Sequence, residues 1–205
     1  MAAATGAAVT VVRDATRDDI EPVAAMLARA FADEPFHQWL FPKPAGRAKR
    51  ARRLFRCEVR NMLRDGVVLV SDDCACASLW GPPDKPQGGW WSQLVVFVTL
   101  VQILGSRTAA VLNELDEVGS MRPAEPHWYL SVLGTDPAQQ GRGMASALLE
   151  RALARCDQEQ RGAWLETASS ERTGFYRRFG FREKQRIQLD NGPPIIGMWR
   201  PSIPT

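Results

Sequence analysis

The spacing of apolar residues predicts alternating strands and helices along the first third of the chain. Residues 9–15 (VTVVRDA) form a short apolar run that is typical of a strand. A helix follows, because Thr16 can cap it, acidic residues fill its first turn, and apolar side chains recur at helical spacing from Val23 to Phe31. A second helix is predicted over 46–66, and its basic run indicates a solvated face.

The rest of the chain continues this alternation. Residues 67–81 read as two strands joined by a turn at 71–73, and prolines and glycines from Pro82 to Gly89 indicate an irregular passage. Two helices broken at Gly105-Ser106 are expected within 90–119. The remaining elements are a strand at 127–134, a helix at 143–158, a strand at 163–168, a short helix at 172–180, and strands at 181–189 and 194–201. This order predicts an α/β domain with a mixed, largely antiparallel sheet.

Composition narrows the possible classes. The 205 residues carry 26 basic and 23 acidic side chains, a net charge of +3, which is too balanced to favour a nucleic-acid or membrane surface as the main partner. The longest apolar run, 94–104, is shorter than the roughly 20 residues of a membrane span, so a buried helix or pocket wall is expected there. No signal-peptide pattern is seen at the start. We expect a cytoplasmic protein with a flexible tail at 1–8 and one domain over 9–205.

The four cysteines do not indicate a metal site. Cys74 and Cys76 form one Cys-x-Cys pair, no second pair accompanies it, and only two histidines are present. We expect buried or spectator thiols and no bound metal.

A glycine-rich loop before the helix at 143–158 suggests a phosphate site. Gly141 and Gly143 let the backbone approach a ligand closely, and the first turn of a helix offers unpaired N–H groups and a positive dipole end. A P-loop is disfavoured because Gly-Met-Ala stands where Gly-Lys-Ser/Thr is required. In a dinucleotide-binding fold Glu166 could bind ribose, but 135–140 separate the strand from the first glycine and too little chain follows. A glycine turn without a ligand is the remaining alternative.

Two motifs in this order resemble those of the GNAT N-acetyltransferase superfamily. Its phosphate loop, Gln/Arg-x-x-Gly-x-Gly/Ala, is matched by residues 140–145 (QGRGMA), and its second signature is matched by 175–181 (FYRRFGF). The segments 28–35 (ARAFADEP), 125–137 and 164–181 further resemble the puromycin N-acetyltransferase branch. The similarity runs from about Val9 to the C-terminus and is weakest in the insert at 80–126.

This resemblance implies a GNAT-like sheet with splayed central strands, flanked by helices, with a helical insert before the cofactor strand. It also implies acetyl-CoA as co-substrate. The pantetheine arm would lie along the strand end at Leu133, Gly134 and Thr135 as an added strand would. The pyrophosphate would lie on the loop and the helix start. At a separate position, an asparagine that helps to hold the cofactor in this family is replaced here by Ser169. The implied phosphate-binding residues are Gln140, Gly141, Arg142, Gly143, Met144 and Ala145.

Attack of an amine on a thioester requires a base and a proton donor for the departing sulfur. Tyr176 is the expected donor, because it lies about a third of a turn from Phe175 and Phe179, which are expected in the core. Glu34 and Glu166 are the preferred bases, with Glu125 and His127 as alternatives. A structural role is possible for each of these four residues.

We expect the acceptor to be a small molecule with a primary amine and an apolar body, such as an antibiotic or toxin. The insert supplies large apolar side chains, including Trp90, Trp91 and Phe97, that could wall a pocket. Two alternatives stay open at this point. One is acetylation of a protein or peptide, and the other is a non-catalytic GNAT-like domain that binds acyl-CoA as a sensor.

Overall fold

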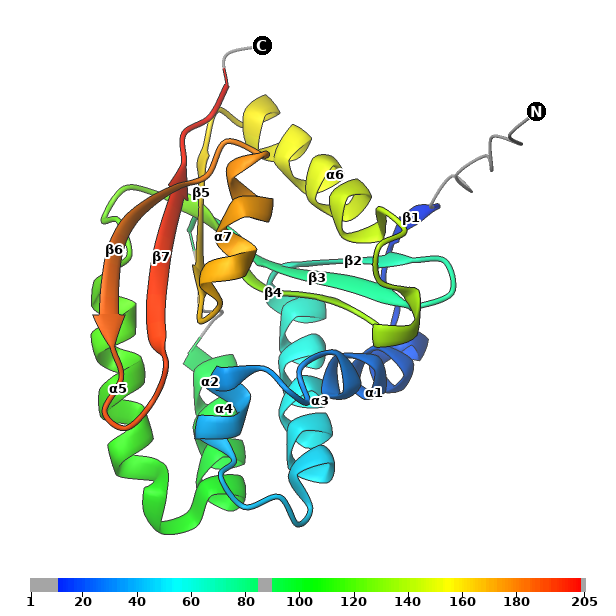
Figure 1. Ribbon diagram of the computed structural model, residues 1–205. Helices are drawn as coiled ribbons and strands as arrows, with labels where there is room; N and C mark the ends of the chain where they lie inside the picture. The colour runs from blue at the N-terminus through cyan, green and yellow to red at the C-terminus, as the bar shows by residue number, and fades with distance from the viewer. Residues whose placement is uncertain (1–10, 85–89, 204–205) are drawn as a thin grey trace, which may run out of the picture.

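The computed structural model describes residues 11–84 and 90–203, apart from the side chains of residues 90–92. Its described strands form one seven-stranded sheet in the order β1-β2-β3-β4-β5-β7-β6, in which only β4 and β5 run parallel (Figure 1). The strands are β1 (Val12–Asp14), β2 (Val67–Ser71), β3 (Cys76–Gly81), β4 (His127–Thr135), β5 (Gly162–Thr167), β6 (Arg182–Gln188) and β7 (Pro194–Arg200). The expected mixed, largely antiparallel sheet is confirmed.

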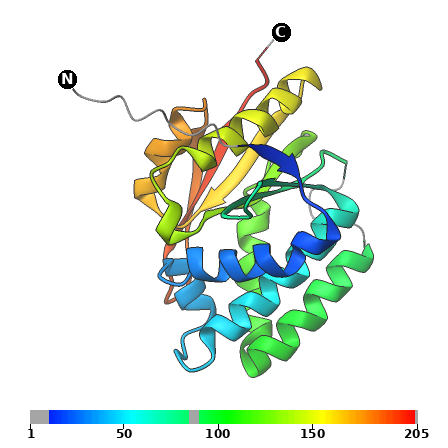
Figure 2. The ribbon, with the colours of Figure 1, turned by 90° about the vertical axis from the view of Figure 1, so that its right-hand side faces the viewer.

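Helices cover both faces of this sheet (Figures 1 and 2). On one face α1 and α3 pack against β2, β3 and β4, and α6 lies on the opposite face. The helices are α1 (Ile20–Ala30), α2 (Pro35–Leu40), α3 (Arg47–Asp65), α4 (Trp90–Leu104), α5 (Thr108–Ser120), α6 (Met144–Gln158) and α7 (Ser170–Arg177), with 3-10 turns at η1 (Arg17–Asp19), η2 (Gly105–Arg107) and η3 (Pro137–Gln139).

The core follows from alternation along the central strands. In β2, Val68 and Val70 face the cluster under α1 and α3, whereas Leu69 faces the cluster under α6. The apolar face of α6 packs on the sheet, where Leu148 and Leu149 are fully buried. Each face of the sheet therefore has its own apolar layer.

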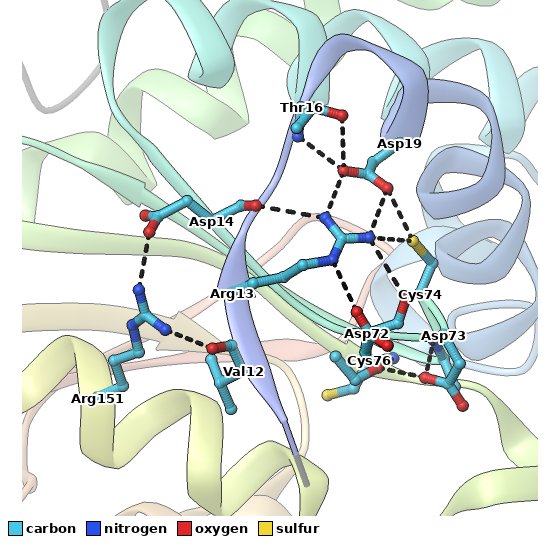
Figure 3. A network of polar contacts seen from close by, with 12 residues as sticks. Val12, Arg13, Asp14, Thr16, Asp19, Asp72, Asp73, Cys74, Cys76 and Arg151 are labelled. Atoms are coloured by element: carbon cyan, nitrogen blue, oxygen red, sulfur yellow. Dashed lines mark hydrogen bonds and ion pairs between the residues drawn. The ribbon is translucent and has the colours of Figure 1, made fainter.

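Polar contacts fasten the N-terminal strand to the start of α1 (Figure 3). The guanidinium of Arg13 donates to both carboxylate oxygens of Asp19 at 2.7 and 2.8 Å, and its Nε lies 3.3 Å from Asp72 in the β2–β3 turn. Thr16, the predicted cap of this helix start, forms a capping box with Asp19. The Arg13 contact holds the pKa of Asp19 well below its usual range. The N-terminal segment and the β2–β3 turn, which are distant in sequence, are thereby joined at one edge of the sheet.

The four cysteines are free thiols. Cys76 and Cys156 are buried, as expected, while Cys57 and Cys74 are partly exposed. Burial raises the pKa of Cys74 and of Cys76 to about 11 and that of Cys156 to about 12. These thiols therefore stay protonated at neutral pH and are poor nucleophiles.

Element boundaries agree with the pattern except near two short helices. The six-residue helix α2 was not predicted, because the first helical pattern ends at Glu34 and Pro35 and the short segment that follows carries little periodic signal. Helix α7 begins at Ser170, two residues earlier than predicted, because Ser169 caps it. The expected tail at 1–8 and part of the irregular passage, 85–89, lie outside the described residues.

The insert forms a helical hairpin that turns at Gly105, whose φ is +58° (Figures 1 and 2). The helical stretch Gln93–Ser120 is long and apolar enough for a membrane span by length and composition, and 17% of its most apolar window is buried. The expectation of a buried helix over 94–104 is wrong in part. Leu100 is buried, but Phe97 is 47% exposed. Leu94, Val98 and Val101 are exposed to a comparable extent. The hairpin contacts the rest of the protein along one side only.

Candidate active site

The two parallel strands separate at the centre of the sheet. β4 pairs with β5 only from His127 to Leu130, whereas it stays paired with β3 as far as Thr135. The register between β3 and β4 shifts at Leu79/Trp80, which leaves Ser131 as the extra residue of a bulge. A bulge bends its strand, and here it lies where β4 leaves β5. The expected splay beside Leu133, Gly134 and Thr135 is confirmed, and it leaves backbone groups of β4 free to bind an extended ligand.

The glycine loop has the backbone geometry of an anion site. Gly141 and Gly143 have φ values of +79° and +81°, and an added Cβ at either position would meet no atom within 4 Å. Gly143 is the N-cap of α6, so the N–H groups of the next residues lack intrahelical partners. Gln140 and Arg142 are exposed beside them. The loop thus offers open space, free donors and positive charge, which fits the pyrophosphate of acyl-CoA.

Packing explains why residue 134 is glycine. A Cβ at this position would lie 2.6 Å from Cδ2 of Leu27 and 2.9 Å from Cε2 of Phe31. The glycine therefore lets α1 approach β4 closely, and its missing side chain faces that helix. A role for Gly134 in cofactor binding can involve only its backbone and stays a prediction.

A cavity of about 420 Å³ opens between the splayed strands and the helices below them. Its walls combine the ends of β4 and β5 with α2, α3, α7 and the hairpin α4–α5. Tyr176, Glu34 and Glu166 all line it, so the structure brings the three predicted catalytic residues together. The alternative bases Glu125 and His127 are not among the described lining residues. They lie at the start of β4, where Nδ1 of His127 is 2.7 Å from the carbonyl oxygen of Glu125.

Tyr176 lies in α7 with 8% of its surface exposed. Burial raises its pKa to about 12; Arg172 opposes this shift, and Glu34 adds to it. The phenol is therefore protonated at neutral pH, and its hydroxyl has no hydrogen-bond partner among the described residues. Phe175 and Phe179 are only partly buried and contact each other at 5.1 Å at the rim of the core, so their expected core role holds in part. Tyr176, rather than either phenylalanine, is the aromatic residue of this motif that lines the cavity.

Glu34 is held by the helix that it caps. Its Oε2 accepts hydrogen bonds from the backbone N–H of His37 at 3.0 Å and lies 3.0 Å from Nδ1 of the same residue. The ring of His37 stacks on Phe55 with centroids 5.2 Å apart. Glu34 is thus a buried helix cap with one oxygen committed to His37, in addition to lining the cavity.

Glu166 is occupied by a polar network on the cavity floor. Its carboxylate accepts from Nε of Arg122 at 2.8 Å, from the hydroxyl of Tyr129 at 2.6 Å and from the indole of Trp164 at 2.6 Å. Arg122 also lies over the Tyr129 ring, 4.0 Å from its centroid. These donors occupy both oxygens of the carboxylate. The network therefore argues for a structural role of Glu166.

Ser169 also has a local structural partner. Its hydroxyl caps α7 by accepting from the backbone N–H of Arg172 at 3.4 Å. The predicted contact of Ser169 with acetyl-CoA is not tested by this geometry.

The sequence reasoning missed Glu58 of α3. This residue lines the cavity, and its Oε2 is buried without a hydrogen-bond partner among the described residues. Its pattern signal was present but ambiguous: Glu58 follows Leu54 by four residues on the apolar stripe of a helix otherwise rich in arginine. A charged residue on that stripe is the kind of departure that marks a functional position.

Known proteins resemble this chain in sequence and fold. A family model for the acetyltransferase (GNAT) domain matches residues 104–200. An uncharacterized N-acetyltransferase of Schizosaccharomyces pombe is 28% identical over 190 residues, which cover 83% of this chain and 74% of that protein. A crystal structure from Corynebacterium glutamicum, described as histone acetyltransferase HPA2 and related acetyltransferase, is 28% identical, with a TM-score of 0.74 and coverage of 96% of this chain and 98% of that one.

A more distant structure shows the same fold. Arylalkylamine N-acetyltransferase 2 from Aedes aegypti is 14% identical, covers 95% of this chain and 99% of its own, and has a TM-score of 0.62. The family match includes both motifs that suggested the resemblance, and the splayed strands and the glycine loop lie where those motifs require them. The GNAT domain model and these related acetyltransferases support the assignment of this chain as an N-acetyltransferase with a GNAT-like fold.

Proposed function

We propose that this enzyme transfers the acetyl group of acetyl-CoA to the primary amine of a small molecule with an apolar body. The observation that carries the proposal is the cavity of about 420 Å³ at the splay of β4 and β5. Its volume falls in the range of small-ligand pockets, roughly 300 to 1000 Å³. Apolar side chains from several elements make up much of its wall: Phe36, Leu40, Leu54, Phe55, Val96 and Leu100.

The donor side of the proposal rests on the free edge of β4 and on the glycine loop. When bound, acetyl-CoA would supply the thioester that is attacked. The N–H groups from Gly141 to Ala145 would hold its pyrophosphate, and the unpaired edge of β4 beyond Leu130 would hydrogen-bond its pantetheine arm. Tyr176 would donate a hydrogen bond to the sulfur as negative charge develops there. Because its pKa is raised, Tyr176 supplies a stable O–H donor at neutral pH.

The pocket walls differ from those expected from the sequence. Phe97 is not among the lining residues, and the side chains of Trp90 and Trp91 lie outside the described part of the chain. The insert instead contributes Val96 and Leu100 from α4. The acceptor specificity would therefore depend on α2 and α3 as much as on the insert.

A second acceptor class is favoured by one comparison. The structure from Corynebacterium glutamicum is described as a histone acetyltransferase, which makes a peptide amine a specific rival. The resemblance to the puromycin N-acetyltransferase branch favours the small molecule instead. An extended peptide binds best along an open edge with backbone partners, whereas the mostly apolar cavity suits a compact body.

Steady-state thiol release from acetyl-CoA tests the proposal. One panel contains amine-bearing aromatic antibiotics, puromycin among them, and simple arylalkylamines; the other contains histone-like and ribosomal-protein peptides at matched amine concentration. We expect the small amines to give the higher kcat/KM. Turnover of the peptides alone would overturn the small-molecule acceptor. Acyl-CoA binding without turnover of any amine would instead support a sensor.

A further inference from the structure

Glu58 lies on the face of α3 that lines the cavity. Leu54, Phe55 and Met62 line the same cavity from this helix, so the carboxylate interrupts an apolar surface. The Oε2 atom of Glu58 is buried and has no hydrogen-bond partner among the described residues. Buried polar groups are nearly always paired, and each exception requires an explanation.

No ion pair of Glu58 is present among the described residues. The cavity lining opposite α3 includes Phe31, which follows α1, and Val96 and Leu100 of α4. Burial raises the pKa of Glu58 to about 7, which fits this apolar environment. A carboxylate with a buried, unpaired oxygen destabilises the folded chain, so a position that keeps one is a candidate for binding a positively charged ligand.

The other carboxylates of the cavity are already paired. Glu34 is bound to His37, and Glu166 accepts hydrogen bonds from Arg122, Tyr129 and Trp164. Of these three carboxylates, Glu58 is therefore the one that lacks a hydrogen-bond donor among the described residues.

We propose that Glu58 binds the ammonium group of the acceptor and accepts its proton, so that the neutral amine attacks the thioester. The inference rests on the proposed function in one respect, namely that the acceptor enters this cavity. It assigns to Glu58 the role of base that was predicted from the sequence for Glu34 or Glu166.

The ammonium transfers one proton to the Glu58 carboxylate, and the freed nitrogen lone pair forms a bond to the thioester carbon. The carbon–sulfur bond then breaks, and the surplus proton on nitrogen passes to the departing sulfur, directly or through the hydroxyl of Tyr176. Glu58 later returns its proton to solvent. The products are the amide, the free thiol and one released proton.

Other charged or titratable groups face the same cavity and will affect the titration of Glu58. From the α2 side these are Glu34 and His37, and from the strands they are Tyr129 and Glu166 with its partner Arg122. Helix α7 contributes Arg172 and Tyr176, and α3 itself contributes Asp65 at the cavity edge. The apolar side chains of Phe31 and of α4 that line the cavity add no charge. A pH profile alone therefore does not assign the base, and variants are required.

The test compares Glu58→Gln with Glu34→Gln, Glu166→Gln and the exposed surface control Glu150→Gln. The amide keeps the shape of the side chain and removes its ability to take a proton. With 2-phenylethylamine, or the fastest amine of the acceptor panel, kcat/KM should fall about 100-fold or more in Glu58→Gln, and its acidic limb near pH 7 should disappear. Acetyl-CoA affinity by calorimetry should stay unchanged. Glu150→Gln should match the parent.

Two further measurements separate binding from folding. The amine should bind the parent more tightly than its alcohol analogue, 2-phenylethanol, and this preference should vanish in Glu58→Gln. The raised pKa means that the folded parent loses stability as pH rises from about 4.5 to 7, so the melting temperature of Glu58→Gln should exceed that of the parent at pH 8 but not at pH 4.

The outcomes distinguish this inference from the proposed function. If amines are turned over but Glu58→Gln keeps the parental rate and pH profile, Glu58 is not the base and the proposed function stands. If Glu58→Gln melts lower than the parent at pH 8, the carboxylate is structural and the inference is overturned. If only peptides are turned over, the small-molecule acceptor fails, and the same variants measured with the peptide still decide the role of Glu58.

Discussion

Replacing Gly143 by asparagine or by aspartate tests the glycine loop as an anion site. Both residues tolerate the left-handed conformation better than other side chains, and both meet open space, since an ideal Cβ at this position has no neighbour within 4 Å. The two side chains have nearly the same shape and differ in charge. Any difference between the variants therefore reports electrostatics rather than strain or bulk.

The expected difference follows from Coulomb's law. A carboxylate about 6 Å from each of the two negative phosphates, in an effective dielectric of about 40 to 80, is repelled by about 0.7 to 1.4 kcal/mol per phosphate. The aspartate variant should therefore bind acetyl-CoA about 1 to 3 kcal/mol more weakly than the asparagine variant, a factor of about 10 to 100. Without ligand, the aspartate variant should instead be the more stable of the two, because a negative charge at the N-terminus of α6 is favourable by about 0.3 to 1 kcal/mol.

Calorimetry with acetyl-CoA at about 0.1 M and about 1 M salt measures the first effect, since the Debye length shortens from about 10 to about 3 Å and the difference should shrink. Urea unfolding of the free protein measures the second. Equal affinities of two folded variants at low salt would refute the placement of the pyrophosphate at this helix start.

Three further substitutions probe the site and its support. Tyr176→Phe should lower kcat by about 10- to 1000-fold without weakening acetyl-CoA binding. The loss should be constant over about pH 6 to 9, because the raised pKa keeps the phenol protonated there. Unchanged turnover would assign the proton donor to another residue. Gly134→Ala should destabilise the fold by about 1 to 3 kcal/mol in urea unfolding because its Cβ overlaps α1, whereas Gly119→Ala in α5, which meets open space, should be neutral or stabilising; equal effects would contradict the close packing. Asp157→Asn should lower the free energy of unfolding by about 3 kcal/mol at neutral pH, because it leaves the buried Arg200 without its ion-pair partner. Arg200 lowers the pKa of Asp157, so the stabilisation by the ion pair is present above about pH 4 and is lost as pH falls further. A deficit of the variant that persists undiminished at about pH 2 would exclude the ion pair as its cause.

The sequence determined most of the fold because its signals are local. Periodicity located α1, α3 and α6, and the turn residues located the β2–β3 hairpin. Thr16 and Gly66 marked helix ends because caps act within a few residues. The phosphate loop was predictable for the same reason, since the glycines, the helix start and the free N–H groups lie within six residues. The short helix α2 was missed because a six-residue segment carries little periodic signal.

Only the tertiary structure decided which carboxylate is free. Glu34, Glu58 and Glu166 are chemically alike in sequence, and only the folded chain shows which of them is paired. Glu166 is paired because Arg122, Tyr129 and Trp164 converge on it, while Oε2 of Glu58 is buried without a partner among the described residues. The same limit applies to the insert, whose apolar residues divide between cavity and surface according to how α4 packs on α3. Desolvation and ion pairing are properties of the assembled space around a side chain, and that space forms only when segments distant in sequence come together.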